Sequence, residues 1–191
     1  MPTKDEDLAV LGAVTTDLAA ALTAIEEYHW ALATPCADWS LRDLVDHVIG
    51  GNWYTSQILA GDASEDALTA TIARFGGEPV SGATAVESAI DQLEAFSSPG
   101  ALDRWWDHVA GELTGRQILG LRLHDLIVHT WDINQTRWPP ALIPKSLADW
   151  GLRELERPGS LMSKHFEISP AASDRPAPVD AASRYLRSFG R

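Results

Sequence analysis

Apolar residues recur every three or four positions along most of this 191-residue chain, which is the spacing of one face of an α-helix. Leu8, Leu11, Leu18, Leu22 and Ile25 follow this rule and predict a first helix over about 4–29. The same reasoning predicts helices from about residue 41, over 84–97, over 114–136, over 145–156 and, weakly, over 181–189, with a helical turn at 65–75 and an irregular or briefly extended segment at 102–110.

Four principal helices, with a long crossover at 61–83 between the second and the third, predict an all-α four-helix bundle. We expect the bundle to occupy residues 1–156. The remainder, 157–191, is rich in Pro, Ser and Ala up to about residue 180 and is expected to pack on the same domain as a short C-terminal extension.

Charge and cysteine content exclude several classes of protein. The formal net charge of −12 and a pI near 4.8 disfavour binding to nucleic acid or to a membrane surface. A single cysteine, Cys36, excludes an internal disulfide framework and a zinc site of several cysteines. No apolar run approaches 18 residues and no signal sequence is visible at the start, so we expect a cytoplasmic protein, as a monomer or a homodimer.

The segment 114–136 is apolar around most of its helical circumference, so we expect most of this helix to be buried. One narrow sector is polar and carries Arg122, Asp125, His129, Asp132 and Thr136. Such a sector is either the only face that meets solvent or the wall of a polar cavity inside the bundle.

Two acidic residues each precede a histidine by four positions, at Asp43/His47 and Asp125/His129, where composition alone predicts about one such pair. This spacing lets two side chains on one helix hold one metal ion, but it also suits a solvated face or a histidine held by a carboxylate. His47 is either a core histidine bonded to Asp43 or a third ligand that Asp43 orients.

Other features near these residues are less specific. Gly50 and Gly51 interrupt a helix, which indicates a close approach by a backbone or a ligand, and Trp53 and Tyr54 beside them could wall a pocket. Ser40 predicts a helix N-cap with Asp43 as its capping-box partner. Cys36 lies in a loop just before that helix, where a thiol can be activated. His124 is expected in the core, and the default for His29, His108 and His165 is the surface.

Three segments resemble one known family. Residues 34–52, TPCADWSLRDLVDHVIGGN, resemble the TPCPGW…RDL…H…G-x-N segment of the mycothiol-dependent, maleylpyruvate isomerase-like group of the DinB-like superfamily. Residues 123–132, LHDLIVHTWD, look like its acid-x-x-x-His-x-Trp-Asp helix, and the end of the chain, YLRSFGR, is similar to its LLAFLGR ending.

The resemblance implies a DinB-like bundle that holds a divalent metal, zinc first and nickel second, through His47, Asp125 and His129. Three protein ligands leave one position open, where a thiol, mycothiol in this family, could bind as thiolate and attack a small electrophilic substrate. The implied activity is a thiol S-transferase or isomerase. Arg122 is then a weak candidate for pairing with an acidic group of thiol or substrate, and Asp43 and Asp132 would orient the ligands.

Two departures from the family bear on the activity. The isomerase proper has glutamate at the position of Asp125, and it carries a further C-terminal domain, so isomerisation of maleylpyruvate itself is not expected. The alternatives are a non-catalytic module that binds a small molecule or a protein, and a metal-free enzyme that uses Asp125 and His129 as an acid–base pair.

Overall fold

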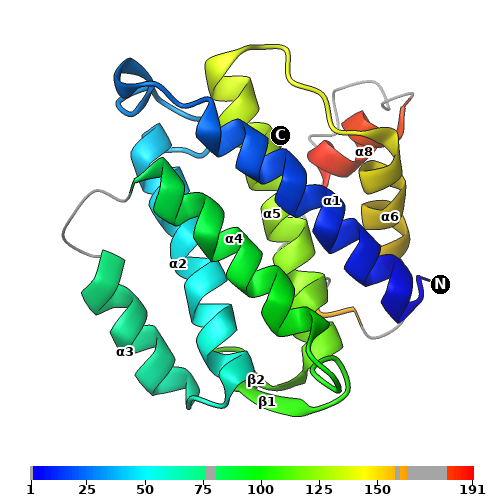
Figure 1. Ribbon diagram of the computed structural model, residues 1–191. Coiled ribbons are helices and arrows are strands. Elements are labelled where there is room, and N and C mark those ends of the chain that lie inside the picture. Colours follow the sequence, from blue (N-terminus) through cyan, green and yellow to red (C-terminus); the bar gives the residue numbers. More distant parts are fainter. Residues whose placement is uncertain (1, 76–80, 158–159, 163–179) are drawn as a thin grey trace.

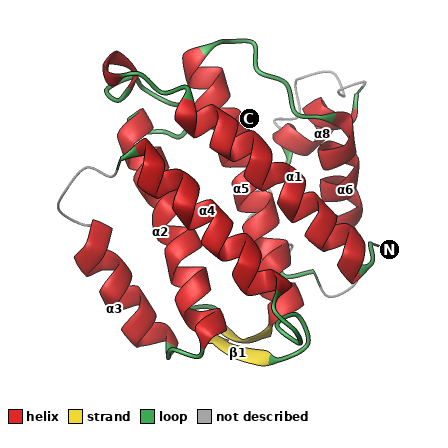
Figure 2. Cartoon of the chain, viewed as in Figure 1, coloured by secondary structure: helices red, strands yellow, loops and turns green. Residues whose placement is uncertain are grey.

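The computed structural model describes residues 2–75, 81–157, 160–162 and 180–191. Its frame is a ring of four helices: α1 (Lys4–Thr23) packs on α4 (Gly82–Ser97) and α5 (Gly115–Arg137), and α2 (Leu41–Ala60) packs on the same two (Figures 1 and 2). The predicted all-α four-helix bundle is therefore confirmed. Within the described residues, no helix is both long enough and apolar enough to span a membrane.

Among the described residues, three further α-helices and one hairpin surround this frame. The crossover contains a full helix, α3 (Ser64–Phe75), which packs on α2, while α6 (Lys145–Leu155) and α8 (Ala181–Arg187) pack on each other. The segment expected to be briefly extended forms β1 (Trp105–His108), and an antiparallel partner, β2 (Gly111–Thr114), follows it directly. Gly111 makes the turn possible because its φ of +107° is costly for residues with a Cβ.

Local capping explains where the main helices begin. The Ser40 hydroxyl accepts a hydrogen bond from the Asp43 amide and the Asp43 carboxylate accepts one from the Ser40 amide, as the sequence predicts. Thr114 and Gln117 form the same box at the start of α5. These reciprocal bonds satisfy backbone donors that the first turn of a helix would leave unpaired.

The first helix is shorter than expected. The prediction of a helix to residue 29 is wrong, because α1 ends at Thr23 and a separate 3-10 turn, η1 (Glu27–His29), follows. Tertiary contacts stabilise this break: the Arg137 Nη1 donates to the Ala21 carbonyl, and the ring of His29 is buried and accepts the Glu26 amide through Nδ1. The expectation that His29 lies at the surface is therefore also wrong.

The core lies inside the ring of α1, α2, α4 and α5. Its largest fully buried side chains come from these helices and from the elements next to them: Trp150, Tyr185, Phe96, Leu11, Leu18, Leu22, Leu41, Leu44, Ile49, Ile58, Ile118 and Leu119. As expected, α5 is buried around most of its circumference. His124 is fully buried, as predicted, and its Nδ1 lies 2.8 Å from the Tyr185 hydroxyl of α8.

Candidate functional site

The polar sector of α5 faces α2, and the side chains of His47, Asp125 and His129 meet between the two helices. The Asp125 Oδ1 lies 3.3 Å from the His47 Nε2 and 3.2 Å from the His129 Nε2. One possible ligand atom from each of the three residues lies within 4.8 Å of the other two. The His47 side chain is 41% exposed, against 19% for Asp125 and 13% for His129, so solvent reaches the cluster from the α2 side.

The second oxygen of Asp125 is bound by an arginine. The Arg122 Nη1 donates to Oδ2 at 2.6 Å. Burial disfavours the charged carboxylate, but the adjacent guanidinium and the hydrogen bonds from His129 and His47 outweigh it and hold the pKa of Asp125 well below its usual range. Asp125 is therefore an ionised carboxylate that directs its free oxygen at both histidines.

The Arg122 guanidinium is itself fixed by a buried polar network. Its Nε donates to Gln92 at 2.9 Å, and its Nη2 donates to the Asn52 side-chain oxygen at 2.8 Å. Gln92 and Asn52 also bond to each other. A Cβ on Gly51 would lie 2.4 Å from the Arg122 Nη1, so the close approach that the glycine pair predicted is made by an arginine side chain rather than by a backbone or a ligand.

The other ring nitrogen of His129 faces a second carboxylate. The Asp132 Oδ2 lies 3.0 Å from the His129 Nδ1, and Arg191 holds Asp132 through two bonds, 2.7 Å from Nε to Oδ1 and 3.0 Å from Nη2 to Oδ2. Burial opposes the charge on Asp132, but these partners keep its pKa below the usual value. Burial likewise opposes protonation of His129, yet its bonds to Asp125, Asp132 and Cys36 raise its pKa to about 11.

Cys36 also belongs to this group. Its Sγ lies 3.0 Å from the Arg191 Nη2, 3.3 Å from the Asp132 Oδ2 and 3.9 Å from the His129 Nδ1. Cys36, His129 and Asp132 thus form a second set of ligand-type atoms within 4.8 Å of one another. Because the two nitrogens of an imidazole point to opposite sides of the ring, this set is distinct from the one at Nε2.

The sequence did not predict that Arg191 belongs to the site. For Cys36 it predicted only a thiol that could be activated, and not its contacts with Asp132 and His129. The similarity of the last residues to the family ending was the signal available for Arg191. Trp39, from the same loop as Cys36, was also missed: its ring centroid lies 5.0 Å from that of His47 and 6.2 Å from that of His129.

Several other expected residues lie elsewhere. Among the described residues no hydrogen bond joins Asp43 to His47, because the Asp43 carboxylate turns back to cap α2 at Ser40, so the expected orienting contact is wrong. Tyr54 is buried and bonds to Ser64 and to the Val109 amide.

The remaining pocket candidates of α2 face α3. Trp53 packs on Phe75, and a Cβ on Gly50 would make an ordinary contact of 3.4 Å with Thr71. Of the histidines expected at the surface, His108 is half-buried and its Nδ1 accepts the Ala110 amide, while His165 lies outside the described residues.

The helical bundle has the DinB-like fold of its structural neighbours. The chain belongs to the mycothiol maleylpyruvate isomerase N-terminal domain family, which matches residues 11–134.

Comparisons with individual proteins agree with this assignment. Two relatives, the uncharacterized proteins MT0763 and Rv0738 of Mycobacterium tuberculosis, are each 28% identical to the chain over 152 residues, which is 76% of this chain and 74% of each relative. Crystal structures of the mycothiol-dependent maleylpyruvate isomerase and of a mutant of it share the fold, with TM-scores of 0.60 and 0.61 at 15% and 14% identity. They align with 77% of this chain and with 67% of their own chains.

Proposed function

We propose that the protein is a metal-dependent enzyme that uses a low-molecular-weight thiol, of the mycothiol type, to act on a small electrophilic substrate as an S-transferase or isomerase. The observation that carries the proposal is the convergence of His47, Asp125 and His129. Membership of the mycothiol maleylpyruvate isomerase N-terminal domain family supports it.

The distances in the cluster fit a divalent ion. Two ligand atoms on a tetrahedral zinc ion, each about 2.1 Å from the metal, are roughly 3.3 to 3.4 Å apart. The Asp125 Oδ1 lies 3.3 and 3.2 Å from the two histidine nitrogens, so this aspartate reaches as far as a ligand must, although it is one methylene shorter than the family glutamate. Three protein ligands leave a position for a thiol.

The surrounding residues would hold these ligands in place. Arg122 occupies the second oxygen of Asp125 and leaves Oδ1 free to face both histidines. Asp132 accepts a hydrogen bond from the His129 Nδ1, which directs the lone pair of Nε2 toward Asp125 and His47. Arg122 is therefore a positioning residue here, rather than a partner of the substrate. A divalent ion held there would supply positive charge that favours the thiolate form of a thiol near neutral pH.

The electrostatics weigh against a metal-free acid–base enzyme. A general acid or base works best when its pKa lies near the working pH. Here Asp125 is held well below its usual pKa and that of His129 is raised to about 11, so the pair forms a fixed ion pair near neutrality rather than a proton donor and acceptor. Metal binding would have to displace the His129 proton, so we expect metal loading to improve as the pH rises.

Elemental analysis of protein purified without an affinity tag or chelator tests the proposal. We expect about one equivalent of zinc or nickel in the wild type and less than about one tenth of that in His129→Ala and Asp125→Ala, because each change removes one of three ligands. Asp43→Ala is the matched control: it removes a carboxylate four residues before a histidine, but the structure uses that carboxylate only to cap α2.

The outcomes separate the candidate functions. Retention of metal by folded His129→Ala and Asp125→Ala would refute this ligand set. A wild type that binds no zinc or nickel even after reconstitution would instead favour a non-catalytic, small-molecule-binding bundle. If the metal is present, a screen of thiols against small electrophiles follows, with His129→Ala and Asp125→Ala as inactive blanks.

A further inference from the structure

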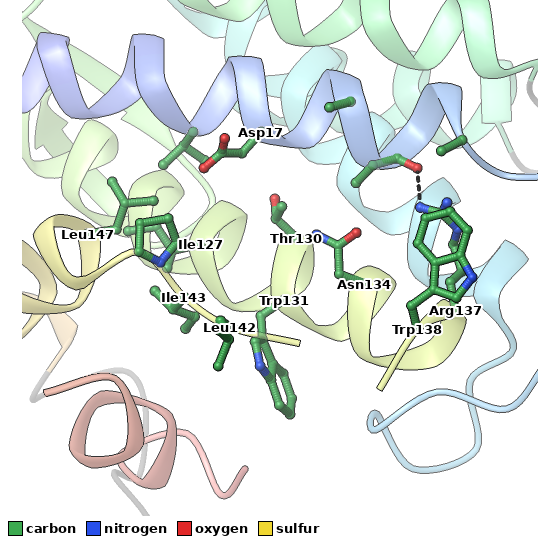
Figure 3. A pocket seen from close by; sticks show the side chains of 15 residues that line it. Asp17, Ile127, Thr130, Trp131, Asn134, Arg137, Trp138, Leu142, Ile143 and Leu147 are labelled. Carbon is green, nitrogen blue, oxygen red and sulfur yellow. Dashed lines mark hydrogen bonds between the residues drawn. The ribbon is translucent and has the colours of Figure 1, made fainter. Parts of the chain in front are cut away.

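A cavity of about 380 Å³ lies beside α5, and Figure 3 shows the side chains that line it. It is open to solvent on one side and is bordered by α1, by the C-terminal half of α5 and by the segment 138–147. Thr130 and Asn134 line it, and on an ideal helix they are rotated by roughly 100° and 140° from His129. This cavity is therefore separate from the proposed metal site and does not depend on it.

The walls are mainly apolar and the cavity is preformed. Ile127, Trp131, Ile143 and Leu147 line it, and the Trp131 Nε1 anchors the 138–147 segment by donating to the Ala141 carbonyl at 3.0 Å. At the rim two large apolar side chains meet solvent, Leu142 at 86% and Trp138 at 66% exposure. A cavity of this size and lining is typical of sites for small molecules with an apolar body.

One lining residue, Arg137, carries a largely buried charge that forms no ion pair within 4.0 Å among the described residues, although the charge of Glu26 acts on it from farther away. Arg137 is only 7% exposed. Its Nη1 donates to the Ala21 carbonyl, but its buried Nε and Nη2 have no hydrogen-bond partner, and neither has the buried Thr130 hydroxyl. Buried charges in proteins are normally paired, because an uncompensated one is costly.

We infer that this cavity binds a small aromatic or aliphatic carboxylate whose acid group pairs with Arg137 and whose apolar body lies against Ile127, Trp131 and Ile143. An anion satisfies the donors that the protein leaves unpaired, and a planar carboxylate matches the geometry of a guanidinium. The Trp138 ring covers this guanidinium at 4.4 Å and must turn outward for direct contact. Because that ring is already 66% exposed, little packing is lost.

The negative charge around the cavity does not attract carboxylates in general, so the contact with Arg137 has to provide the selectivity for an acid. The chain has a net charge of −12, and the exposed Asp17 lies at the mouth of the cavity, so neither attracts a carboxylate from solvent. Binding therefore needs both the apolar walls and the Arg137 guanidinium. An uncharged molecule of the same shape lacks the second contribution.

The test uses the full-length protein with naphthoate as the probe and its uncharged amide as the matched ligand. Calorimetry gives the affinities, and amide NMR spectra locate the site. We expect naphthoate to bind saturably, with shifts in α1, in 127–137 and in 138–147, and about 10-fold more tightly than the amide, as a charge-assisted hydrogen bond predicts.

Two variants test the role of Arg137. Arg137→Met should weaken naphthoate binding about 10-fold, because it keeps the aliphatic stem and removes the charge. Arg104→Met is the matched control, since it removes a guanidinium that also lies over a tryptophan ring, 6.0 Å from Trp106, but far from the cavity; it should leave binding unchanged. Because Arg137→Met could unfold the protein, Ala20→Phe provides a second route: it narrows the cavity from an exposed position of α1, keeps Arg137, and should abolish binding.

The inference is overturned if naphthoate does not shift these amides, if the amide binds as tightly as the acid, or if the two arginine variants lose affinity equally. Undiminished binding to folded Ala20→Phe protein also overturns it, because the ligand would then lie elsewhere.

Discussion

Replacing Gly51 by alanine tests whether the buried arginine network is as rigid as its contacts imply. A Cβ at this position would lie 2.4 Å from the Arg122 Nη1, 2.9 Å from Cζ and 3.1 Å from Nη2. The end of an arginine side chain can usually shift cheaply. Here the guanidinium is bound to Gln92, to Asn52 and to Asp125, so it can move by the required ångström only by lengthening or losing some of these bonds.

The size of the effect follows from two opposing contributions. Alanine in a helix interior is favoured over glycine by about 1 kcal/mol. Against this, a hydrogen bond to a charged group contributes about 1.5–3 kcal/mol, and overpacking of a core costs about 1–3 kcal/mol. If the network is rigid and both costs act, they exceed the gain, and we expect Gly51→Ala to lower the free energy of unfolding by about 1.5–5 kcal/mol.

Gly12→Ala is the matched control. Gly12 also lies inside a long helix, α1, but nothing lies within 4 Å of a Cβ built there. Only the helix propensity acts at this site, so the change should stabilise the protein by about 0.5–1 kcal/mol. The two substitutions are chemically identical and are expected to act in opposite directions.

Urea denaturation followed by far-UV circular dichroism measures both effects, and the midpoint should fall for Gly51→Ala and rise for Gly12→Ala. A Gly51→Ala protein as stable as the Gly12→Ala protein would show that Arg122 moves freely, and our account of how Asp125 is positioned would be wrong. The metal content of Gly51→Ala gives a second reading, because displacement of Arg122 also releases Asp125.

Three further predictions follow from the same structure. Burial, with a contribution from the nearby charge of Arg157, lowers the pKa of His124 from 6.5 to about 3, so the unfolded state binds the proton more readily than the folded state. The contribution of His124 to the free energy of unfolding is therefore fully present above pH 6.5 and is lost as the pH falls toward about 3, with a slope of up to about 1.4 kcal/mol per pH unit. His124→Asn should remove this slope in urea titrations across that pH range. Tyr185→Phe should cost about 1–2 kcal/mol, because it leaves the buried His124 ring without its hydroxyl partner, whereas Tyr28→Phe at a position that is 67% exposed should change the unfolding midpoint little. If the metal proposal holds, Arg191→Met should weaken zinc binding about 10-fold in a competition assay by releasing Asp132 from its two bonds, and the exposed Arg184→Met should not; equal zinc affinities would remove Arg191 from the site.

The fold followed from the sequence where its cause is local. The periodicity of the apolar residues and the cap at Ser40 act over a few residues. The cap and the periodicity predicted the start of α2, and the periodicity predicted the range and the burial of α5. They failed where a distant group intervenes, as at the end of α1, whose last turn is bonded to Arg137 across 116 positions of the chain.

The same division applies to the candidate site. The spacing of Asp125 and His129 places both side chains on one face of a helix whatever the fold. The sequence also offered His47 as a third ligand, and the resemblance to a family favoured that alternative. No local pattern could bring Cys36 within 3.0 Å of Arg191, 155 positions away, or show that Gly51 makes room for Arg122.

Periodicity, capping and charge are properties of neighbouring residues, so the sequence by itself determined a helical bundle with a polar sector on its most buried long helix. Contacts between distant segments decide three other features. They decide which second helix that sector faces, which carboxylate contacts a histidine and which only caps a helix, and where a buried cation is left without an ion pair. Those contacts exist only once the chain has packed, and the tertiary structure alone decided them.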